Sequence, residues 1–239
     1  MNVETAAAAI LRRGVDLDSK TRYTEALVCY QEGLQLLVDS MKNESGAKRN
    51  YLRSKIEEYM SRAEKLKDII TQLKEQGKYH EQITIENNST GHSYDVIFNR
   101  FLDIDVISVR IEDPYIRAFH QCQNLVMFFE LLVRKCANLK DISLITTPEK
   151  NTEQQMWLNE IKQNLLIYNV NFSVSYSSTL HDRQIILSNG WIIKIGRGLD
   201  YFKKAAGRFS LGIFDYNLRQ CHETTIDVFH QANVKQSFG

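Results

Sequence analysis

A histidine and an arginine stand close together in a setting suited to phosphate chemistry. His181 and Arg183 follow the predicted strand Val170–Tyr176, and Arg183 opens the next predicted strand, Arg183–Leu187. An imidazole can act as a nucleophile or an acid toward a phosphodiester, and a guanidinium binds phosphate well. The pair therefore marks a candidate site for a phosphate group.

This stretch resembles the His-x-Lys-x4-Asp motif of phospholipase D enzymes, in which the His reacts, the Lys grips phosphate and the Asp supports the site. Here Arg183 replaces the Lys, and Ser188 stands where the Asp should be. Glu112-Asp113-Pro114-Tyr115 after a predicted strand also resembles that fold. These enzymes need two such motifs and this chain has one, so the resemblance implies a degenerate site. A working phosphodiesterase, assembled through a homodimer, is the alternative.

The region that follows, residues 190–208, is basic and contains aromatic side chains. Near an anionic membrane each Lys or Arg of such a cluster contributes about 1 kcal/mol. The same composition fits RNA, because aromatic rings stack on bases. A third interpretation is a solvated loop with its aromatics in the core. The cations are Lys194, Arg197, Lys203, Lys204 and Arg208, and the aromatics are Trp191, Tyr201 and Phe202.

The first half of the chain must form helices. Residues 3–76 contain no proline and are dominated by Ala, Leu, Glu, Lys and Arg, which favour helix. Apolar residues recur at alternating spacings of four and three, which places each set on one stripe of a helix. Because the connections are short, we predict an antiparallel three-helix bundle. The stripes are Val3, Ala7, Ile10, Gly14 and Leu17; Tyr23, Leu27, Tyr30, Leu34, Leu37 and Met41; and Leu52, Ile56, Tyr59, Ala63, Leu66, Ile70 and Leu73.

Two residues of the third predicted helix lie beside its stripe. Met60 is one position past Tyr59, and Glu64, four residues further on, shares the face of Met60. A methionine flanked by a carboxylate suits a partner helix that carries a leucine and an arginine. The alternative is that Met60 widens the core stripe and Glu64 is a solvated charge.

The first half resembles MIT (microtubule interacting and transport) domains. The segment Tyr59-Met60-Ser61-Arg62-Ala63-Glu64-Lys65-Leu66-Lys67 resembles their third helix, and Tyr23-x-x-Ala26-Leu27-x-x-Tyr30-x-x-Gly33 resembles their second. In that family the groove between these helices binds C-terminal helical motifs of ESCRT-III subunits. The resemblance implies a peptide site made of Met60, Ala63, Glu64, Lys67, Leu36 and Val38. A second groove, between helices one and three, would be lined by Leu11 and Val15.

From about residue 83 predicted strands and helices alternate, and Asn189-Gly190 is a strong hairpin signal. We therefore predict an α/β domain with a mixed sheet flanked by helices. Residues 1–76 and 93–239 form the two predicted domains, and 77–92 the linker. The predicted strands are Ile104–Ile111, Leu139–Thr147, Val170–Tyr176, Arg183–Leu187 and Trp191–Ile195, and the helices are Tyr94–Leu102, Ile116–Lys135 and Glu149–Tyr168.

The composition excludes several classes of protein. Thirty Lys and Arg balance 29 Asp and Glu, so the net charge does not indicate a nucleic-acid partner. No apolar run reaches about 18 residues, and the N-terminus does not have the pattern of a signal peptide. The four cysteines lack zinc or thioredoxin spacing, so we expect reduced thiols, no metal and no cofactor.

The two domains, in this order, resemble a family in which an MIT domain precedes a phospholipase D-like domain. The stretch Gly-Trp-x-Ile-Lys-Ile-Gly-Arg-Gly-Leu-Asp-Tyr-Phe (190–202) carries this resemblance. It implies a homodimer formed by the C-terminal domain, binding to acidic phospholipid membranes and a role in abscission at the end of cytokinesis. The predicted function is a non-catalytic adaptor, cytoplasmic and peripheral on endosomal membranes and at the midbody. A phosphodiesterase that uses His181, or a nucleic-acid-binding protein, is the alternative.

Overall fold

The computed structural model describes residues 3–42, 44–149 and 153–231. The chain divides into two compact units, Met1–Glu81 and Gln82–Gly239. Residues 1–2 of the predicted first domain, 150–152 of the predicted helix Glu149–Tyr168 and 232–239 of the second domain lie outside the described residues.

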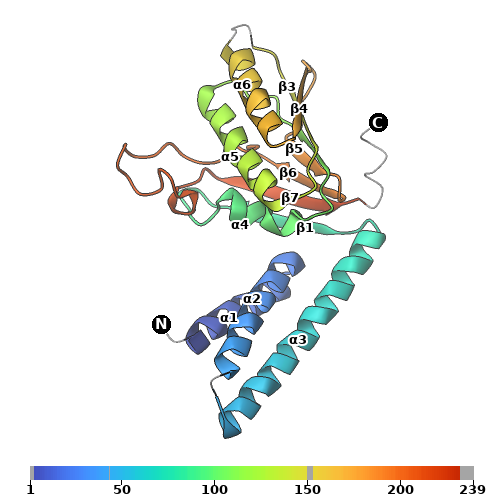
Figure 1. Cartoon of the computed structure of the whole chain (residues 1–239), viewed down its shortest axis with the longest axis vertical. Coiled ribbons are helices and arrows are strands. Elements are labelled where there is room, and N and C mark those ends of the chain that lie inside the picture. The colour runs from blue at the N-terminus through green and yellow to red at the C-terminus, as the bar shows by residue number, and fades with distance from the viewer. Residues whose placement is uncertain (1–2, 43, 150–152, 232–239) are drawn as a thin grey trace. The chain divides into compact units, whose positions relative to one another are not determined.

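The described part of the first unit forms three helices, α1 (Val3–Ser19), α2 (Tyr23–Met41) and α3 (Gly46–Glu75), which confirms the predicted bundle (Figure 1). Its core contains Ala7, Tyr30 and Leu66, one from each helix. Glycine at position 33 lets α1 approach α2, because a Cβ there would lie 2.6 Å from Leu11 Cγ.

One expected surface residue of the bundle belongs to its core. Leu11 is buried against Gly33, whereas the sequence pattern placed it beside the stripe as a lining residue of a second groove. The close approach of α1 to α2 at Gly33 widens the buried face of α1. Of the two residues expected in that groove, Val15 is the one that is exposed.

An ion pair ties the three helices together. Arg62 Nε of α3 donates to Asp18 Oδ2 of α1 at 2.7 Å, and Tyr30 Oη of α2 donates to the same oxygen at 3.1 Å. The guanidinium hydrogen bond holds the pKa of Asp18 below its usual value, and burial beside Asp18 raises the pKa of Tyr30 to about 12.

The second unit is built on one mixed sheet. Among the described residues seven strands pair in the order β1-β7-β6-β5-β2-β3-β4. Strands β2, β3 and β4 are parallel, while β5 runs antiparallel to β2 and β6, and β6 antiparallel to β7. The strands are β1 (His80–Ile85), β2 (Ser108–Glu112), β3 (Asp141–Thr146), β4 (Asn171–Tyr176), β5 (Gln184–Leu187), β6 (Trp191–Ile195) and β7 (Thr224–His230).

The helices α5 (Phe119–Lys135) and α6 (Glu153–Ile167) connect the parallel strands. Both crossovers step in the same direction along the sheet, and right-handed crossovers of that kind place both helices on one face. Figure 1 shows α5 and α6 side by side along the sheet. Phe129 of α5 packs on Phe172 of β4, with ring centroids 5.3 Å apart. The short helices α4 (Tyr94–Phe98), η1 (Asn99–Phe101) and η2 (Tyr216–Leu218) complete the unit.

The predicted hairpin is confirmed: β5 and β6 pair antiparallel through Ser188–Gly190, and Gly190 adopts a φ of 101°. The expected helix Ile116–Lys135 begins at Phe119, and the expected helix Tyr94–Leu102 is divided into α4 and η1. Three larger differences concern strands. Strand β2 begins at Ser108, because Ile104 is exposed in a turn. Strand β1 lies within the segment 77–92, which the sequence pattern presented as a linker. Strand β7 was not predicted, although its alternate residues are buried.

Candidate functional site

The outer face of α3 carries the residues expected to bind a peptide. Met60 is 53% exposed, and Glu64 and Lys67 are also exposed. Ala63, which the resemblance also implied for the peptide site, is buried in the core of the bundle and is not part of this exposed face. The interpretation that Met60 belongs to the core is therefore wrong, since about half of its surface meets solvent.

Glu64 differs from its acidic neighbours on α3. Glu57 pairs with Arg53 at 3.1 Å, and Glu58 pairs with Lys55 at 2.7 Å. Within the described residues Glu64 has no hydrogen-bond or ion-pair partner. Its carboxylate is therefore free to accept a guanidinium from outside the chain.

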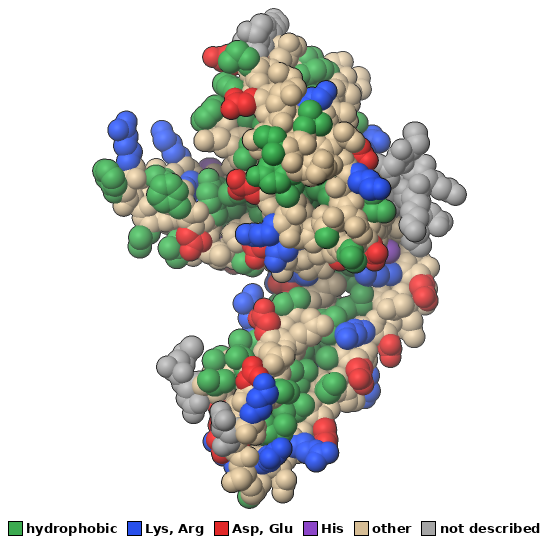
Figure 2. Space-filling model, in the orientation of Figure 1, with side chains coloured by type: hydrophobic (Ala, Val, Ile, Leu, Met, Phe, Trp, Pro, Cys, Tyr) green, Lys and Arg blue, Asp and Glu red, His purple; other side chains and the backbone are tan. Residues whose placement is uncertain are grey.

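Apolar side chains beside this face are incompletely covered. On α2, Leu36 and Val38 are partly buried, and Leu36 packs against the core. Figure 2 shows hydrophobic side chains along the strip between α3 and the pair of shorter helices. The partly buried apolar residues that pack against the core of the bundle are Ile10, Tyr23, Leu27, Leu36, Met41, Ile56, Tyr59 and Ile69.

In the second unit Arg183 is occupied by contacts within the chain. Its Nη1 donates to the Gly196 carbonyl at 2.8 Å, and its guanidinium lies 3.9 Å from the centre of the Tyr115 ring. Its Nε lies 3.9 Å from Asp113 Oδ1. Because β5 runs antiparallel beside β2 and β6, Arg183 joins the end of β2 to the end of β6.

Asp113, at the end of β2, is the buried partner in this junction. The residue is 4% exposed, and burial raises its pKa to about 6, against the opposing effects of the Tyr115 backbone N–H and Arg183. Gly198 adopts a φ of 59°, and a Cβ there would lie 2.0 Å from Asp113 Oδ2. The carboxylate of Asp113 therefore packs directly against Gly198. Any other residue at position 198 would displace this carboxylate.

The structure does not bring the three motif positions into one site. His181 is exposed in the segment between β4 and β5 and has no hydrogen-bond partner among the described residues. Ser188 lies at the opposite end of β5 from Arg183. Its Oγ accepts from the backbone N–H groups of Ile107 and Ser108, at 2.8 and 3.1 Å, and thereby holds the start of β2.

The predicted basic residues are spread over several elements. Lys194 lies on β6 opposite Asp227, and Arg197 Nε donates to the Asp200 carbonyl. Lys203 Nζ donates to Asn88 Oδ1 at 2.6 Å. Lys204 and Arg208 are exposed. The structure places these last two with Lys203 on one loop, away from Lys194.

The aromatic residues of this stretch are not on the surface. Trp191, Tyr201 and Phe202 are all buried, which confirms the interpretation that the aromatics of this stretch belong to the core. The exposed apolar residues lie further along the chain, at Phe209, Leu211 and Phe214. Sequence reasoning missed them because the loop has no periodicity, although two aromatics amid Gly and Ser were a visible signal.

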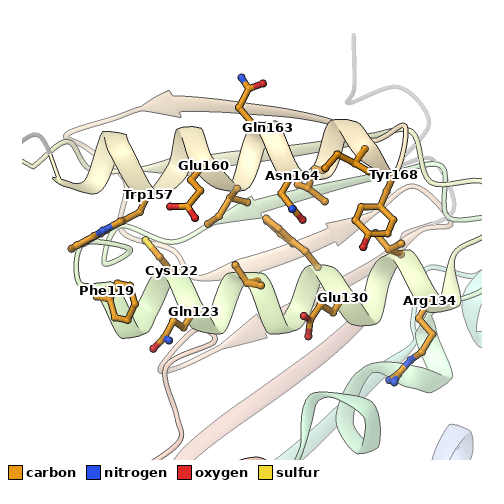
Figure 3. Close-up of a pocket in the computed structure, with 16 residues that line it drawn as sticks. Phe119, Cys122, Gln123, Glu130, Arg134, Trp157, Glu160, Gln163, Asn164 and Tyr168 are labelled. Atoms are coloured by element: carbon orange, nitrogen blue, oxygen red, sulfur yellow. The ribbon is translucent and has the colours of Figure 1, made fainter.

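An apolar cleft of about 710 Å³ lies between α5 and α6. Phe119 and Trp157 meet edge to face at one end, with ring centroids 5.6 Å apart, and Tyr168 and Arg134 lie at the other (Figure 3). Ile167 is strongly exposed beside Tyr168. Large apolar patches of this kind are uncommon on the surface of a monomer.

Within the described residues, no three His, Cys, Asp or Glu side chains are grouped so as to hold a metal ion. Over the same described ranges no helix has the length and apolar character needed to cross a membrane.

Comparison with known proteins gives matches to both units. Residues 5–68 match the family of MIT (microtubule interacting and transport) domains. Residues 91–230 match the family described as the phospholipase D-like domain at the C-terminus of MIT. The chain is also 51% identical to MIT domain-containing protein 1 of Mus musculus, over 97% of this chain and 95% of the mouse protein.

Proposed function

Since this chain belongs to the family that joins an MIT domain to a C-terminal phospholipase D-like domain, we propose that it is a non-catalytic adaptor. Its first unit binds C-terminal helices of ESCRT-III subunits, and its second unit binds acidic phospholipid membranes. The observation that carries the first part is the exposed pair Met60 and Glu64 on one face of α3.

The chemistry of this face selects an amphipathic helix. Met60 is flexible and polarisable, so it packs against a leucine without requiring one fixed shape. The unpartnered carboxylate of Glu64, one turn along α3, accepts an arginine of the same ligand.

The test is a titration of the full chain with fluorescent C-terminal peptides of ESCRT-III subunits, read by anisotropy. Met60→Asp places a charge against the apolar side of the ligand, so binding falls by more than about tenfold. Tyr51→Asp is the matched control, because Tyr51 is exposed on the same helix but lies about two and a half turns before Met60 and so faces the opposite side. Equal affinity of Met60→Asp and wild type would remove this face as the binding site.

The membrane part of the proposal is supported by the cations on one loop, Lys203, Lys204 and Arg208. We propose no nucleic-acid partner, because the rings of Tyr201 and Phe202 are buried and offer no surface for base stacking. The test is flotation with phosphatidylcholine vesicles, with and without phosphatidylserine. Lys204→Glu with Arg208→Glu abolishes binding to the acidic vesicles, whereas the matched control, Lys140→Glu with Lys162→Glu at exposed sites, retains it.

The absence of catalysis is supported by the state of the motif residues. Arg183 already contacts Asp113, Tyr115 and the Gly196 carbonyl, so little of its guanidinium remains for a phosphate. The check is turnover of bis-p-nitrophenyl phosphate. A rate that disappears in His181→Ala would overturn the proposal in favour of a phosphodiesterase.

We also propose that the second unit forms a homodimer through the cleft between α5 and α6. Phe119, Ile167 and Tyr168, which line the cleft, are each more than half exposed, and a second copy of the chain would bury them across a two-fold axis. Light scattering measures the mass: wild type is a dimer, Ile167→Asp is a monomer, and Ile104→Asp, at an exposed site elsewhere, stays dimeric. A monomeric wild type would end the dimer proposal, while a dimeric Ile167→Asp would end only its location.

In the cell this adaptor works in abscission, on endosomal membranes and at the midbody. The support is the family to which the chain belongs. A fluorescent fusion of the chain that lacks midbody signal, or that keeps it after Met60→Asp, would contradict recruitment through ESCRT-III.

A further inference from the structure

The loop formed by residues 203–219 exposes large apolar side chains to an unusual degree. Phe209 is 100% exposed, Phe214 91% and Leu211 87%. Isolated exposed apolar residues are ordinary on a protein surface, but several almost fully exposed ones on one loop mark an interaction site. This loop is the red and orange segment of Figure 1, and its surface in Figure 2 combines hydrophobic and basic side chains.

The base of the 203–219 loop is held in place by the chain itself. The Arg219 guanidinium donates to the carbonyls of Gly212, Ile213 and Lys203, and so joins its two arms. The Arg219 guanidinium also lies 4.6 Å from the centre of the Tyr216 ring. Tyr216 in turn packs edge to face on the buried Phe202, at 4.7 Å. The base is therefore anchored to the core of the unit.

The charges of the 203–219 loop indicate what kind of partner its apolar surface binds. The cations Lys203, Lys204 and Arg208 precede the apolar residues, and one acid, Asp215, follows them. Apolar residues beside cations fit the interfacial zone of a bilayer with anionic headgroups, where the rings enter the acyl boundary and the cations remain at the headgroups. A soluble protein partner would need a complementary acidic and apolar surface of its own.

We propose that the 203–219 loop is an insertion loop, which places Phe209, Leu211 and Phe214 into the outer layer of an acidic phospholipid membrane. This inference rests on the proposed membrane function and specifies how the membrane is held. Cations alone give binding that salt removes, whereas buried apolar surface gives a component that salt does not weaken. The two components together hold the chain at the bilayer.

The experiment uses the full chain and vesicles of phosphatidylcholine mixed with phosphatidylserine. Phe209→Ser and Phe214→Ser each weaken binding by about tenfold, because each removes one side chain from the acyl boundary. Ile104→Ser is the matched control, since Ile104 is exposed in the same unit between two acids, Asp103 and Asp105, and its loss leaves binding unchanged. All three sites are exposed, so folding is retained.

The depth to which the loop enters the bilayer is measured directly with the variant Phe209→Trp. When vesicles carry lipids brominated in the acyl chain, the fluorescence of this tryptophan is quenched, while Ile104→Trp gives no added quenching over wild type. Wild type that binds acidic vesicles, with no effect of either serine variant and no quenching, would overturn insertion and leave electrostatic membrane binding intact. Wild type that binds no vesicles would remove both the membrane function and the insertion loop.

Discussion

The face of α3 around Glu64 and the junction around Arg183 use charged residues in opposite ways. Glu64 is exposed and unpartnered among the described residues, whereas Arg183 and the buried Asp113 contact each other and their neighbours. Both positions belong to recognisable motifs. The comparison shows that a residue in a motif is available for function only when the fold leaves its polar atoms free.

The sharpest test of this difference is removal of Arg183. Arg183→Ala leaves the buried Asp113 without its cation and the Gly196 carbonyl without its donor, so the second unit loses about 3 kcal/mol of unfolding free energy. Urea denaturation measures the loss. Arg134→Ala, which breaks an exposed ion pair with Asp95, costs less than about 1 kcal/mol. Equal stability of Arg183→Ala and wild type would mean that the guanidinium is free after all.

The pH dependence of Asp113 sharpens the same comparison. The pKa of Asp113 is raised to about 6 in the folded chain. Protonation of Asp113 therefore contributes stability that is fully present below the ordinary pKa of an aspartate and is lost as pH rises through about 6. Asp113→Asn, which still accepts the Tyr115 N–H, therefore gains stability over wild type as pH rises through this window. The gain at neutral pH is about 1 to 3 kcal/mol. A constant difference between the two proteins from pH 4 to pH 8 would contradict the raised pKa.

The smallest expected change in stability is at Glu64, where a substitution weakens peptide binding but hardly changes the unfolding free energy. Glu64→Gln changes the unfolding free energy by less than about 0.5 kcal/mol, because the carboxylate has no partner in the described chain. It weakens peptide binding by about tenfold, or 1.4 kcal/mol, through loss of the arginine contact. Glu57→Gln is the control, since Glu57 pairs with Arg53 on the same helix. A peptide that binds both variants alike would exclude Glu64 as the carboxylate of the site.

The regular spacing of apolar residues in residues 3–76 was sufficient to predict the three helices and to place Met60 outside the core. A helix turns by a constant angle per residue, so spacing alone decides which side chains share a face. The spacing did not predict the burial of Leu11, because the width of the buried face of α1 depends on how closely α1 approaches α2 at Gly33. Strand β1 was missed because its burial depends on pairing with β7, far along the chain.

What the sequence by itself determined is local: the three helical stripes, the Asn189-Gly190 hairpin, the alternation of strands and helices, and the family of each half. These follow from backbone geometry and from side chains near one another in the chain. Only the tertiary structure decided which charges and rings are available. It turned Arg183 inward to Asp113, buried Tyr201 and Phe202, and left Phe209 and Phe214 outside. Burial is a property of contacts between distant segments, and no local pattern specifies it.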